Sequence, residues 1–289
     1  MVTIKEMAQE LGVSTTTVSN VIHGKTKEVS LANIERIQKI LKKYDYTPNI
    51  NARNLASKRS KIIGLLIKSK QNKIANRFED PFIGRILGAI ERHVRQKGYY
   101  LMVYAVDDVH QVQQFTMSWN MDGLITSGFV EGDIRYLKER FKNPIAIIDD
   151  YDTNGLGNCV NIRIEDEQAE YLLTKYVISC GHRKLAFLAD NLVNLDKIRF
   201  QGFCRALKEA NIPVSREENF IQIYASDAGE PQNMDEIYEK SFSYTALLCA
   251  SDYYAVHIEN MLLDRERKIP EEISIAGFDD VPISRMVRP

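Results

Sequence analysis

Cysteine is scarce in this sequence, and none of it is paired. The 289 residues include four cysteines that are far apart and form no C-x-x-C motif: Cys159, Cys180, Cys204 and Cys249. Single cysteines at such spacings exclude the disulfide framework of a small secreted domain and the common cysteine zinc sites. We interpret them as reduced thiols of a cytoplasmic protein.

Long hydrophobic runs are also missing. No apolar stretch approaches the roughly 20 residues that a membrane-spanning helix needs, and the N-terminus has no apolar segment of the kind found in signal peptides. These absences exclude an integral membrane protein and a secreted one, so we expect no membrane partner.

The motifs of the common enzyme classes are absent as well. No G-x-x-x-x-G-K-[ST] or G-x-G-x-x-G phosphate loop follows a predicted strand, and no G-x-S-x-G sequence occurs. The five histidines are scattered, which argues against a histidine metal site. Asp149-Asp150 and Asp279-Asp280 could pass for metal-binding or acid–base pairs, yet we predict no catalytic residue, no metal and no cofactor.

Charge is distributed unevenly along the chain. The formal net charge is −1, but residues 1–60 contain ten Lys and Arg against five Asp and Glu, a net of +5. The remaining residues therefore carry a net of −6. A basic head on an acidic body suits a protein whose head meets nucleic-acid phosphates.

Residues 3–24 have the pattern of two short helices joined by a tight turn. Thr3 and Glu6 have the spacing of a capping box, in which each side chain satisfies a backbone N–H of the other residue. Gly12 can take the positive φ that ends a first helix, and Ser14 is placed to cap a second one. This arrangement predicts a helix-turn-helix.

The second of these helices separates its apolar and polar residues. Val18, Val21 and Ile22 recur at helical spacing and are expected to face the core. The other face carries short side chains that can donate to and accept from base edges in a DNA major groove, namely Thr15, Thr16, Ser19 and Asn20. This face predicts a DNA-reading helix.

A third helix is predicted over residues 31–44, with Ser30 as its cap. Its buried stripe is expected to comprise Leu31, Ile34, Ile37, Leu41 and Tyr44. Because proline disfavours helix in the residue before it, Pro48 ends this unit, and residues 1–47 are assigned to an all-α DNA-binding domain. Residues 48–60 are polar and basic, and they are expected to form a linker or a segment that folds on binding.

Beyond residue 60, strand and helix patterns alternate. Nine short apolar runs suit buried parallel strands, at residues 62–67, 100–106, 123–126, 145–148, 159–164, 185–189, 220–224, 246–250 and 273–278. Helical patterns separate them, for example at residues 82–96, 167–179, 197–210 and 253–265. The alternation predicts a doubly wound α/β body. Its length suits two similar subdomains, which we assign to residues 61–155 and 156–289.

The order of these parts and several short motifs resemble the LacI/GalR family of bacterial transcriptional repressors. In the head the motifs are GVSTTTVS at residues 12–19, YTPN at 46–49 and NARNL at 51–55. In the body they are MDGLI at residues 121–125, GHRK at 181–184 and GFDD at 277–280. The Thr15-Thr16 pair is most similar to the purine-repressor branch.

The resemblance implies a helix-turn-helix head, a hinge helix, and two doubly wound parallel-sheet subdomains like those of periplasmic sugar-binding proteins. It also implies a homodimer on a pseudo-palindromic operator in double-stranded DNA. The residues that it assigns to DNA binding are Thr3, Ser14, Thr15, Thr16, Thr17, Ser19, Asn20, His23, Asn49, Ala52, Arg53, Leu55, Lys58 and Arg59. Among these, Leu55 is expected to wedge between base steps in the minor groove.

An effector is expected at the carboxyl ends of the body's strands, where doubly wound folds hold their ligands. A guanidinium from Arg199 and a carboxylate from Asp279 can clamp vicinal hydroxyls of a sugar, or the polar edge of a base. Asp149 and Asp252 occupy equivalent strand ends, and Phe82 could stack on a ring. Asp252 could equally serve as a helix cap, and Phe82 could be a core residue.

Two features depart from the family pattern. Asn20 stands where many members have Arg, and because Asn pairs best with adenine and Arg with guanine, the operator is expected to differ. The sequence stops at Pro289, whereas family members continue and return a strand and a helix to the first half of the body. We therefore expect an exposed sheet edge and apolar face in that half.

The sequence as a whole predicts a cytoplasmic DNA-binding repressor controlled by a small effector, a sugar in the favoured interpretation. A purine-like corepressor and control by a protein partner are alternatives. A sugar-modifying enzyme fused to a helix-turn-helix is less favoured, because the phosphate loops are missing. The effector, the operator, and the choice between dimer and tetramer are left open.

Overall fold

The computed structural model describes residues 2–47, 59–68, 78, 81–129, 131–149, 157–226 and 231–287. The chain forms two compact units, Met1–Ser60 and Lys61–Pro289, called here the head and the body. Five of the residues predicted to bind DNA lie outside the described residues: Asn49, Ala52, Arg53, Leu55 and Lys58.

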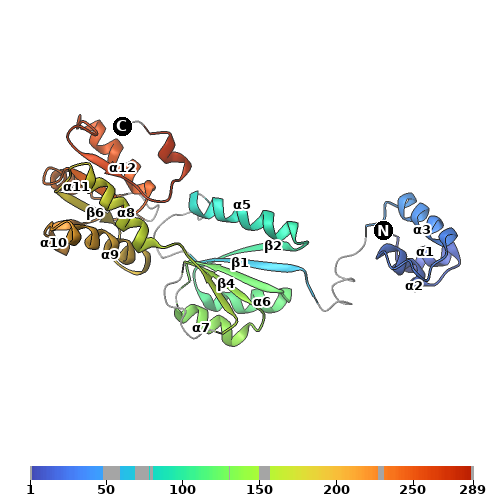
Figure 1. The fold of residues 1–289 in the computed structure, drawn as a ribbon. Coiled ribbons are helices and arrows are strands. Elements are labelled where there is room, and N and C mark those ends of the chain that lie inside the picture. Colours follow the sequence, from blue (N-terminus) through green and yellow to red (C-terminus); the bar gives the residue numbers. More distant parts are fainter. Residues whose placement is uncertain are drawn as a thin grey trace. The chain divides into compact units, whose positions relative to one another are not determined.

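The head consists of the helices α1 (Ile4–Leu11), α2 (Thr15–Ile22) and α3 (Leu31–Lys43), as Figure 1 shows. The capping box forms as predicted, because Glu6 N–H donates to Thr3 Oγ1 at 3.2 Å and Thr3 N–H donates to Glu6 Oε2 at 2.8 Å. Gly12 follows α1 with a φ of 68°. Ser14 Oγ accepts from Thr17 N–H at 3.0 Å and caps α2, so the predicted helix-turn-helix is confirmed.

The core of the head takes residues from all three helices. It is formed by Met7, Ala8, Val18, Ile37 and Ile40, with Val21 and Ile22 packed against it. The predicted stripe of α3 was wrong at both ends, where Leu31 is 80% exposed and Tyr44 is 36% exposed. These two residues lie at the ends of α3, beyond its contact with the other helices, and Tyr44 instead donates its hydroxyl to Glu10.

The first half of the body is a parallel sheet with the strand order β2-β1-β3-β4-β5. Its strands are β1 (Ile62–Lys68), β2 (Tyr100–Val106), β3 (Gly123–Ser127), β4 (Ile145–Ile148) and β5 (Cys159–Ile162). Its helices are α5 (Pro81–Gln96), α6 (Val112–Trp119) and α7 (Glu131–Arg140), with the short η2 (Val109–Gln111) before α6. Figure 1 shows α5 on one side of the sheet and α6 and α7 on the other.

The two faces of this first sheet are covered unequally. Leu66, Leu124 and Ile145 belong to a buried cluster with residues of α6 and α7, such as Ile134. On the edge strand β5, Val160 and Ile162 are 63% and 59% exposed. Because side chains alternate along a strand, both point away from the buried cluster that holds their neighbour Cys159.

The second half of the body is a parallel sheet with the order β7-β6-β8-β9. Its strands are β6 (Leu185–Ala189), β7 (Phe220–Gln222), β8 (Ala246–Cys249) and β9 (Ser274–Ala276). Its helices are α8 (Asp166–Ser179), α9 (Asn194–Glu209), α10 (Arg216–Asn219), α11 (Met234–Ser241) and α12 (Asp252–Asp264), followed by η3 (Pro282–Arg285). All nine predicted strands are thus present in the described part of the chain. The predicted boundary at residues 155 and 156 was wrong in one respect, because β5 falls after it and yet pairs with β4 of the first sheet.

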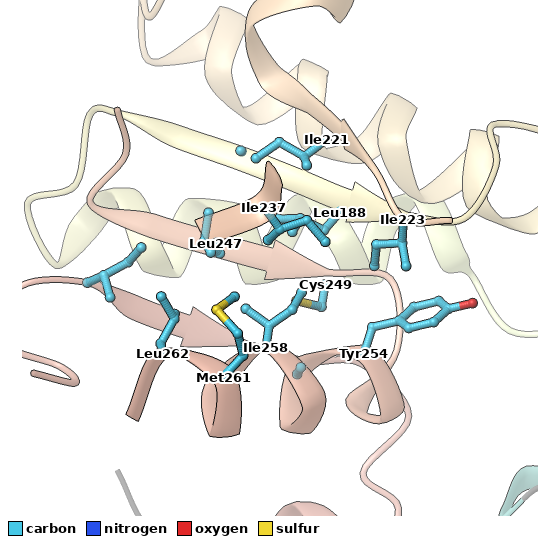
Figure 2. Close-up of a cluster of buried hydrophobic side chains, with 13 residues drawn as sticks. Leu188, Ile221, Ile223, Ile237, Leu247, Cys249, Tyr254, Ile258, Met261 and Leu262 are labelled. Atoms are coloured by element: carbon cyan, nitrogen blue, oxygen red, sulfur yellow. The ribbon is translucent and has the colours of Figure 1, made fainter. Parts of the chain in front are cut away.

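Hydrophobic clusters cover both faces of the second sheet. On one face, Ile258 and Met261 of α12 pack against Leu247 and Cys249 of β8, as Figure 2 shows. On the other face, Phe203 of α9 packs against alternate residues of β6 and β8. The sheet therefore has the two-sided burial that an all-parallel sheet requires.

Helices α8 and α9 approach each other very closely at Gly202. A Cβ atom added to Gly202 would lie 2.1 Å from the carbonyl oxygen of Glu167 and 2.9 Å from the backbone nitrogen of Tyr171. Only a glycine fits there without moving a helix. In the described residues, no helix combines the length and apolarity needed to cross a membrane.

Gly202→Ala should lower the free energy of unfolding by about 1–3 kcal/mol, because its methyl group would meet backbone atoms that cannot move separately from α8. Urea unfolding followed by far-UV circular dichroism measures the change. Gly88→Ala is the matched control, since a Cβ at this position of α5 meets nothing within 4 Å. Equal stability of the two variants would contradict the close contact.

Candidate functional site

Helix α2 presents its polar face away from the core of the head. Thr15 and Thr16 are exposed in its first turn, while Ser19 and Asn20 are half-buried further along. Val18, on the opposite side, is fully buried. The exposed threonine hydroxyls can both donate and accept, as contacts with base edges require.

The other described residues predicted to bind DNA have different roles in the head. Thr3 and Ser14 use their hydroxyls as helix caps, and Thr17 Oγ1 lies 2.8 Å from Ser14 Oγ. His23 is exposed at the end of α2, and Arg59 is exposed as well. The two caps define the residues at which α1 and α2 begin, and so they determine the position of the first turn of α2.

In the body, the sheet topology selects one edge for ligand binding. In both sheets the second strand is added on one side of the first strand and the third strand on the other side. The strand order therefore has a switch point between β1 and β3 in one sheet and between β6 and β8 in the other. Ligands of doubly wound folds bind beyond the carboxyl ends of strands at such switch points. In the second sheet, Ala250 and Ser251 follow β8 at this edge.

Arg199 lies at this edge, on α9, and binds partners from three different segments. Its Nε donates to Asp166 Oδ1 at 2.9 Å, and its Nη2 donates to Asp279 Oδ1 at 3.2 Å. Its Nη1 donates to the carbonyl oxygen of Ala250. The guanidinium carbon lies 3.7 Å from the ring centroid of Phe278, in the geometry of a cation–π contact.

The guanidinium of Arg199 is buried, but only some of its N–H groups have hydrogen-bond partners among the described residues. The residue is only 4% exposed. Burial lowers its pKa, but the charges of Asp279 and Asp166 more than offset this, so the pKa is raised above its ordinary value. A guanidinium carries five N–H groups, and three of them have the partners named above. The other two, one on Nη1 and one on Nη2, have none in the described part of the body.

Asp279 and Asp149 both take a backbone conformation that few residues accept. Their φ angles are 99° and 57°, and such positive values favour Gly, Asn and Asp. Asp149 follows β4 of the first sheet, yet its carboxyl interacts electrostatically with Asp166, Arg199 and Asp279 of the second half. Burial, followed by the charge of Asp166, raises the pKa of Asp149 to about 6.

The other two predicted effector residues are placed differently. Asp252 is buried at the start of α12, where its Oδ2 accepts from Val281 N–H at 2.8 Å. A Cβ on Gly277 would lie 2.2 Å from its Oδ1, so the carboxylate is enclosed by its own loop. Phe82 lies in the first turn of α5 and is 37% exposed. Arg199, Asp279 and Asp149 therefore interact with one another, whereas the carboxylate of Asp252 accepts a hydrogen bond from the backbone of the segment before η3.

Sequence reasoning missed two partners of Arg199. Asp166 is the first residue of α8 and resembles an ordinary acidic helix start, so nothing local marks it as an ion-pair partner. Phe278 stands within the GFDD motif, directly before Asp279, which was predicted to bind the effector. Its aromatic character was the available signal for a contact with Arg199. Across the described residues, no group of His, Cys, Asp and Glu is arranged to hold a metal ion.

A buried carboxyl, Glu170, lies behind this cluster on α8. Its exposure is 0%, and Thr174 Oγ1 donates to its Oε1 at 3.3 Å. Its Oε2 has no hydrogen-bond partner in the described regions. Burial raises the pKa of Glu170 to about 8, although the Arg199 charge and the Thr174 hydrogen bond act in the opposite direction. This shift favours the protonated, neutral form of Glu170 near neutral pH.

Comparison with known proteins gives matches over both units. Residues 3–49 match the model of bacterial regulatory proteins of the lacI family, and residues 174–289 match that of a periplasmic binding protein-like domain. The HTH-type transcriptional repressor PurR of Haemophilus influenzae strain PittEE is 28% identical, over 100% of this chain and 84% of that protein. The ribose operon repressor of H. influenzae strain Rd is 29% identical, over 100% and 85%.

Solved structures share the fold. The lac repressor dimer bound to operator and the anti-inducer ONPF has a TM-score of 0.79 and 24% identity, covering 97% of this chain and 83% of that one. The complex of the transcriptional regulator CelR with cellobiose has a TM-score of 0.65 and 20% identity, covering 98% and 84%. Both likenesses extend over head and body.

Replacement of Glu170 should change how stability depends on pH. Between about pH 5 and pH 8 the carboxyl ionises in the unfolded chain but keeps its proton in the folded one, so stability is lost as the pH rises. Glu170→Gln removes this loss. Its stability relative to the wild type should rise by roughly 3 kcal/mol from pH 5 to pH 8, at about 1.4 kcal/mol per pKa unit.

Urea unfolding at the two pH values measures this difference, and any fixed cost of burying the amide cancels. Glu239→Gln, at an exposed position of α11, serves as the control. A relative stability of Glu170→Gln that does not vary with pH would show that Glu170 is ionised in the folded protein.

Proposed function

Because residues 3–49 match the lacI family of bacterial regulatory proteins and residues 174–289 match a periplasmic binding protein-like domain, we propose that this chain is a member of the lacI family, a sequence-specific DNA-binding transcriptional repressor controlled by a small-molecule effector. It acts as a homodimer on a pseudo-palindromic operator, and it acts in the cytoplasm, where that DNA is. Its function is binding and not catalysis. The observation that carries the proposal is the exposed threonine face of α2 on a capped helix-turn-helix.

DNA reading follows from the geometry of the head. The short side chains of Thr15, Thr16 and Asn20 let the helix backbone approach the floor of a major groove, where base edges can be distinguished. The net charge of +5 over residues 1–60 supplies the attraction to phosphates that is common to all DNA sequences. In this proposal, residues 48–60 form the hinge, and Leu55 is its minor-groove wedge.

The effector binds at the cluster of Arg199, Asp279 and Asp149. The two N–H groups of Arg199 that have no described partner can donate to a ligand, and the Asp149 carboxylate can accept from one. Vicinal hydroxyls of a sugar supply both on one edge, which supports a sugar as effector. The relative named a ribose operon repressor and the solved complex with cellobiose also support it. A purine-like base edge also has donors and acceptors, so a purine-like corepressor is the second candidate.

Effector binding is coupled to DNA binding through the two halves of the body. Asp149 follows a strand of the first sheet, whereas Arg199 and Asp279 belong to the second half. A ligand held by all three favours one relative orientation of the halves. It therefore shifts the population between conformations that differ in affinity for DNA.

Asn20→Ala should lower operator affinity by roughly 1–3 kcal/mol and relax specificity at one base pair, because it removes one bidentate contact. Binding to random DNA should stay unchanged. The operator can be selected from a random DNA library, and fluorescence anisotropy then measures both affinities. Gln38→Ala, at an exposed position of α3, is the control. Equal losses on operator and random DNA would remove Asn20 from base reading.

Asp279→Asn should abolish the response of operator binding to the effector while leaving binding without effector intact. The substitution keeps the backbone conformation, because Asn accepts a φ of 99°, but it removes the carboxylate that pairs with Arg199. Loss of the hydrogen-bonded charge partner of a buried guanidinium costs about 2–5 kcal/mol, which is enough to lose a micromolar ligand.

Asp280→Asn is the matched control for this variant. Asp280 has the same charge and also a positive φ, of 49°, but it is exposed and pairs with Arg285 at 2.6 Å. Its replacement should leave the effector response in place. An effector response that survives in Asp279→Asn would place the effector elsewhere.

A further inference from the structure

The end of the first sheet at which its strands begin is basic. The helices of this half run antiparallel to the strands, so their last turns lie at that end, as Figure 1 shows for α5. The last turns and the segments that lead into the strands comprise, among the described residues, 59–61, 93–99, 116–122, 137–144 and 157–158. We call this surface the basic end, because it contains seven Lys and Arg against two Asp and Glu.

Backbone hydrogen bonds hold these segments side by side. The Tyr100 N–H donates to the carbonyl oxygen of Lys61 at 2.7 Å, and the Asp122 N–H donates to that of Ile62 at 2.9 Å. The segment before β4 is bound to β3 in the same way. Because neighbouring strands lie about 5 Å apart, the starts of β2, β1, β3 and β4 extend over roughly 15 Å. The basic side chains therefore belong to one continuous surface.

Acidic neighbours compensate only part of this charge. Arg140 pairs with Glu139 at 2.8 Å, and Arg95 pairs with Glu91, in the preceding turn of α5, at 2.7 Å. Both pairs are at the surface, where such contacts are weak and screened by salt. They leave several cations of the basic end without a carboxylate.

Three lysines of the basic end have no ion pair in the described part of the chain. Lys97 and Lys142 are exposed, and Lys138 is half-buried on the last turn of α7. The ammonium group of Lys142 donates only to the carbonyl oxygen of Glu139, at 3.3 Å. These side chains can contact an anion without first breaking a salt bridge.

Helix dipoles alone do not explain the excess of positive charge. The C-terminal end of a helix carries partial negative charge, so basic residues are favourable there. The second sheet has a corresponding end, formed by residues 176–184, 206–219, 238–245 and 261–273. These residues include eight Lys and Arg against eight Asp and Glu. Helix ends of the same kind are thus neutral in the second half and carry a net charge of +5 in the first.

The chain enters the body at the basic end. The first strand of the body is β1, and residues 48–60 connect it to the head. Thirteen residues can span at most about 45 Å, so DNA held by the head is within reach of this surface. Residues 61–289 carry a net charge of −6, yet the part of the body next to the linker has the positive charge of the head.

We propose that the basic end is a second DNA-contacting surface, which binds phosphates of the DNA held by the head without reading its bases. Lysine and arginine at such a surface release counterions from DNA and so add affinity that is common to all sequences. An acidic protein would meet the same charges, but the covalent link to a DNA-reading head favours DNA. The inference rests on the proposed function, since it adds a contact from the body to the same complex.

The triple variant Lys97→Gln, Lys138→Gln and Lys142→Gln of the full chain tests this inference. Fluorescence anisotropy over a series of salt concentrations measures its affinity for the selected operator and for random DNA. Each lost phosphate contact should reduce the slope of log affinity against log salt by about 0.9. We expect a reduction of about one or more, with an affinity about tenfold lower near 0.1 M salt. The ratio of operator to random affinity should not change.

Two further triple variants serve as controls. Lys184→Gln, Lys208→Gln and Lys268→Gln remove the same charge from exposed positions at the corresponding end of the second sheet, and the wild-type slope should remain. Arginine at residues 97, 138 and 142 keeps the charge, so this variant should also keep the wild-type slope. An unchanged ratio of operator to random affinity shows that the head of each variant is folded and reads DNA.

Three results would overturn the inference. The first is a wild-type slope in the glutamine variant of the basic end, which would leave an acidic protein as the partner of this surface. The second is an equal loss in both glutamine variants, which would reflect the net charge of the chain and not a contact. The third is a changed ratio of operator to random affinity, which would connect these lysines to base reading or to folding.

The wild-type chain separates this inference from the proposed function. If it binds no selected DNA sequence better than random DNA, the repressor is overturned whatever the slopes are. If it reads an operator and the glutamine variant of the basic end keeps the wild-type slope, only the second DNA contact is overturned.

Discussion

The buried charge of Arg199 is the constraint on which the second half of the body depends. Removing a guanidinium from water is costly unless charges and hydrogen bonds replace the lost hydration. Here the replacement comes from the start of α8, from the residue after β8, and from the segment after β9. These segments are distant in sequence, and each must reach its place before the charge is compensated. The same network leaves two N–H groups without a partner among the described residues, and under the proposed function these are the groups that an effector would meet.

Close packing of two helices holds this network in register. Gly202 lets α8 and α9 touch at the backbone, about one turn from Arg199 on α9 and beside Glu167, the residue that follows Asp166, on α8. Glu170, on the next turn of α8, is fully buried, and this burial raises its pKa. Arg199 and Asp166 are therefore positioned by a closely packed helix pair, whereas Ala250 and Asp279 lie in the segments that follow β8 and β9.

The fold could be predicted because its signals are local. Buried parallel strands are continuous apolar runs, and β2, β4 and β6 begin and end at the predicted residues. At β9 the predicted run continued through Phe278, whereas the strand ends at Ala276, and Asp279 in the segment that follows accepts a hydrogen bond from Arg199.

The features that could not be predicted depend on contacts between residues far apart in the sequence. Asp166 lies 33 residues from Arg199, and no spacing rule joins them. Glu170 stands in a helix with several exposed residues, so its complete burial depends on how α9 packs against α8. Leu31 and Tyr44 followed the helical period, but only the path of the neighbouring helices decides where the core ends.

The positive φ angles at Asp149 and Asp279 restrict these two positions to a small set of residue types. Glycine, asparagine and aspartate accept that conformation readily, and a single nucleotide change converts an aspartate codon into either of the other two. Each step removes a charge, or the whole side chain, without redirecting the chain. Related proteins can therefore acquire new ligands at these two positions by point mutation, one charge at a time, while the scaffold is inherited unchanged.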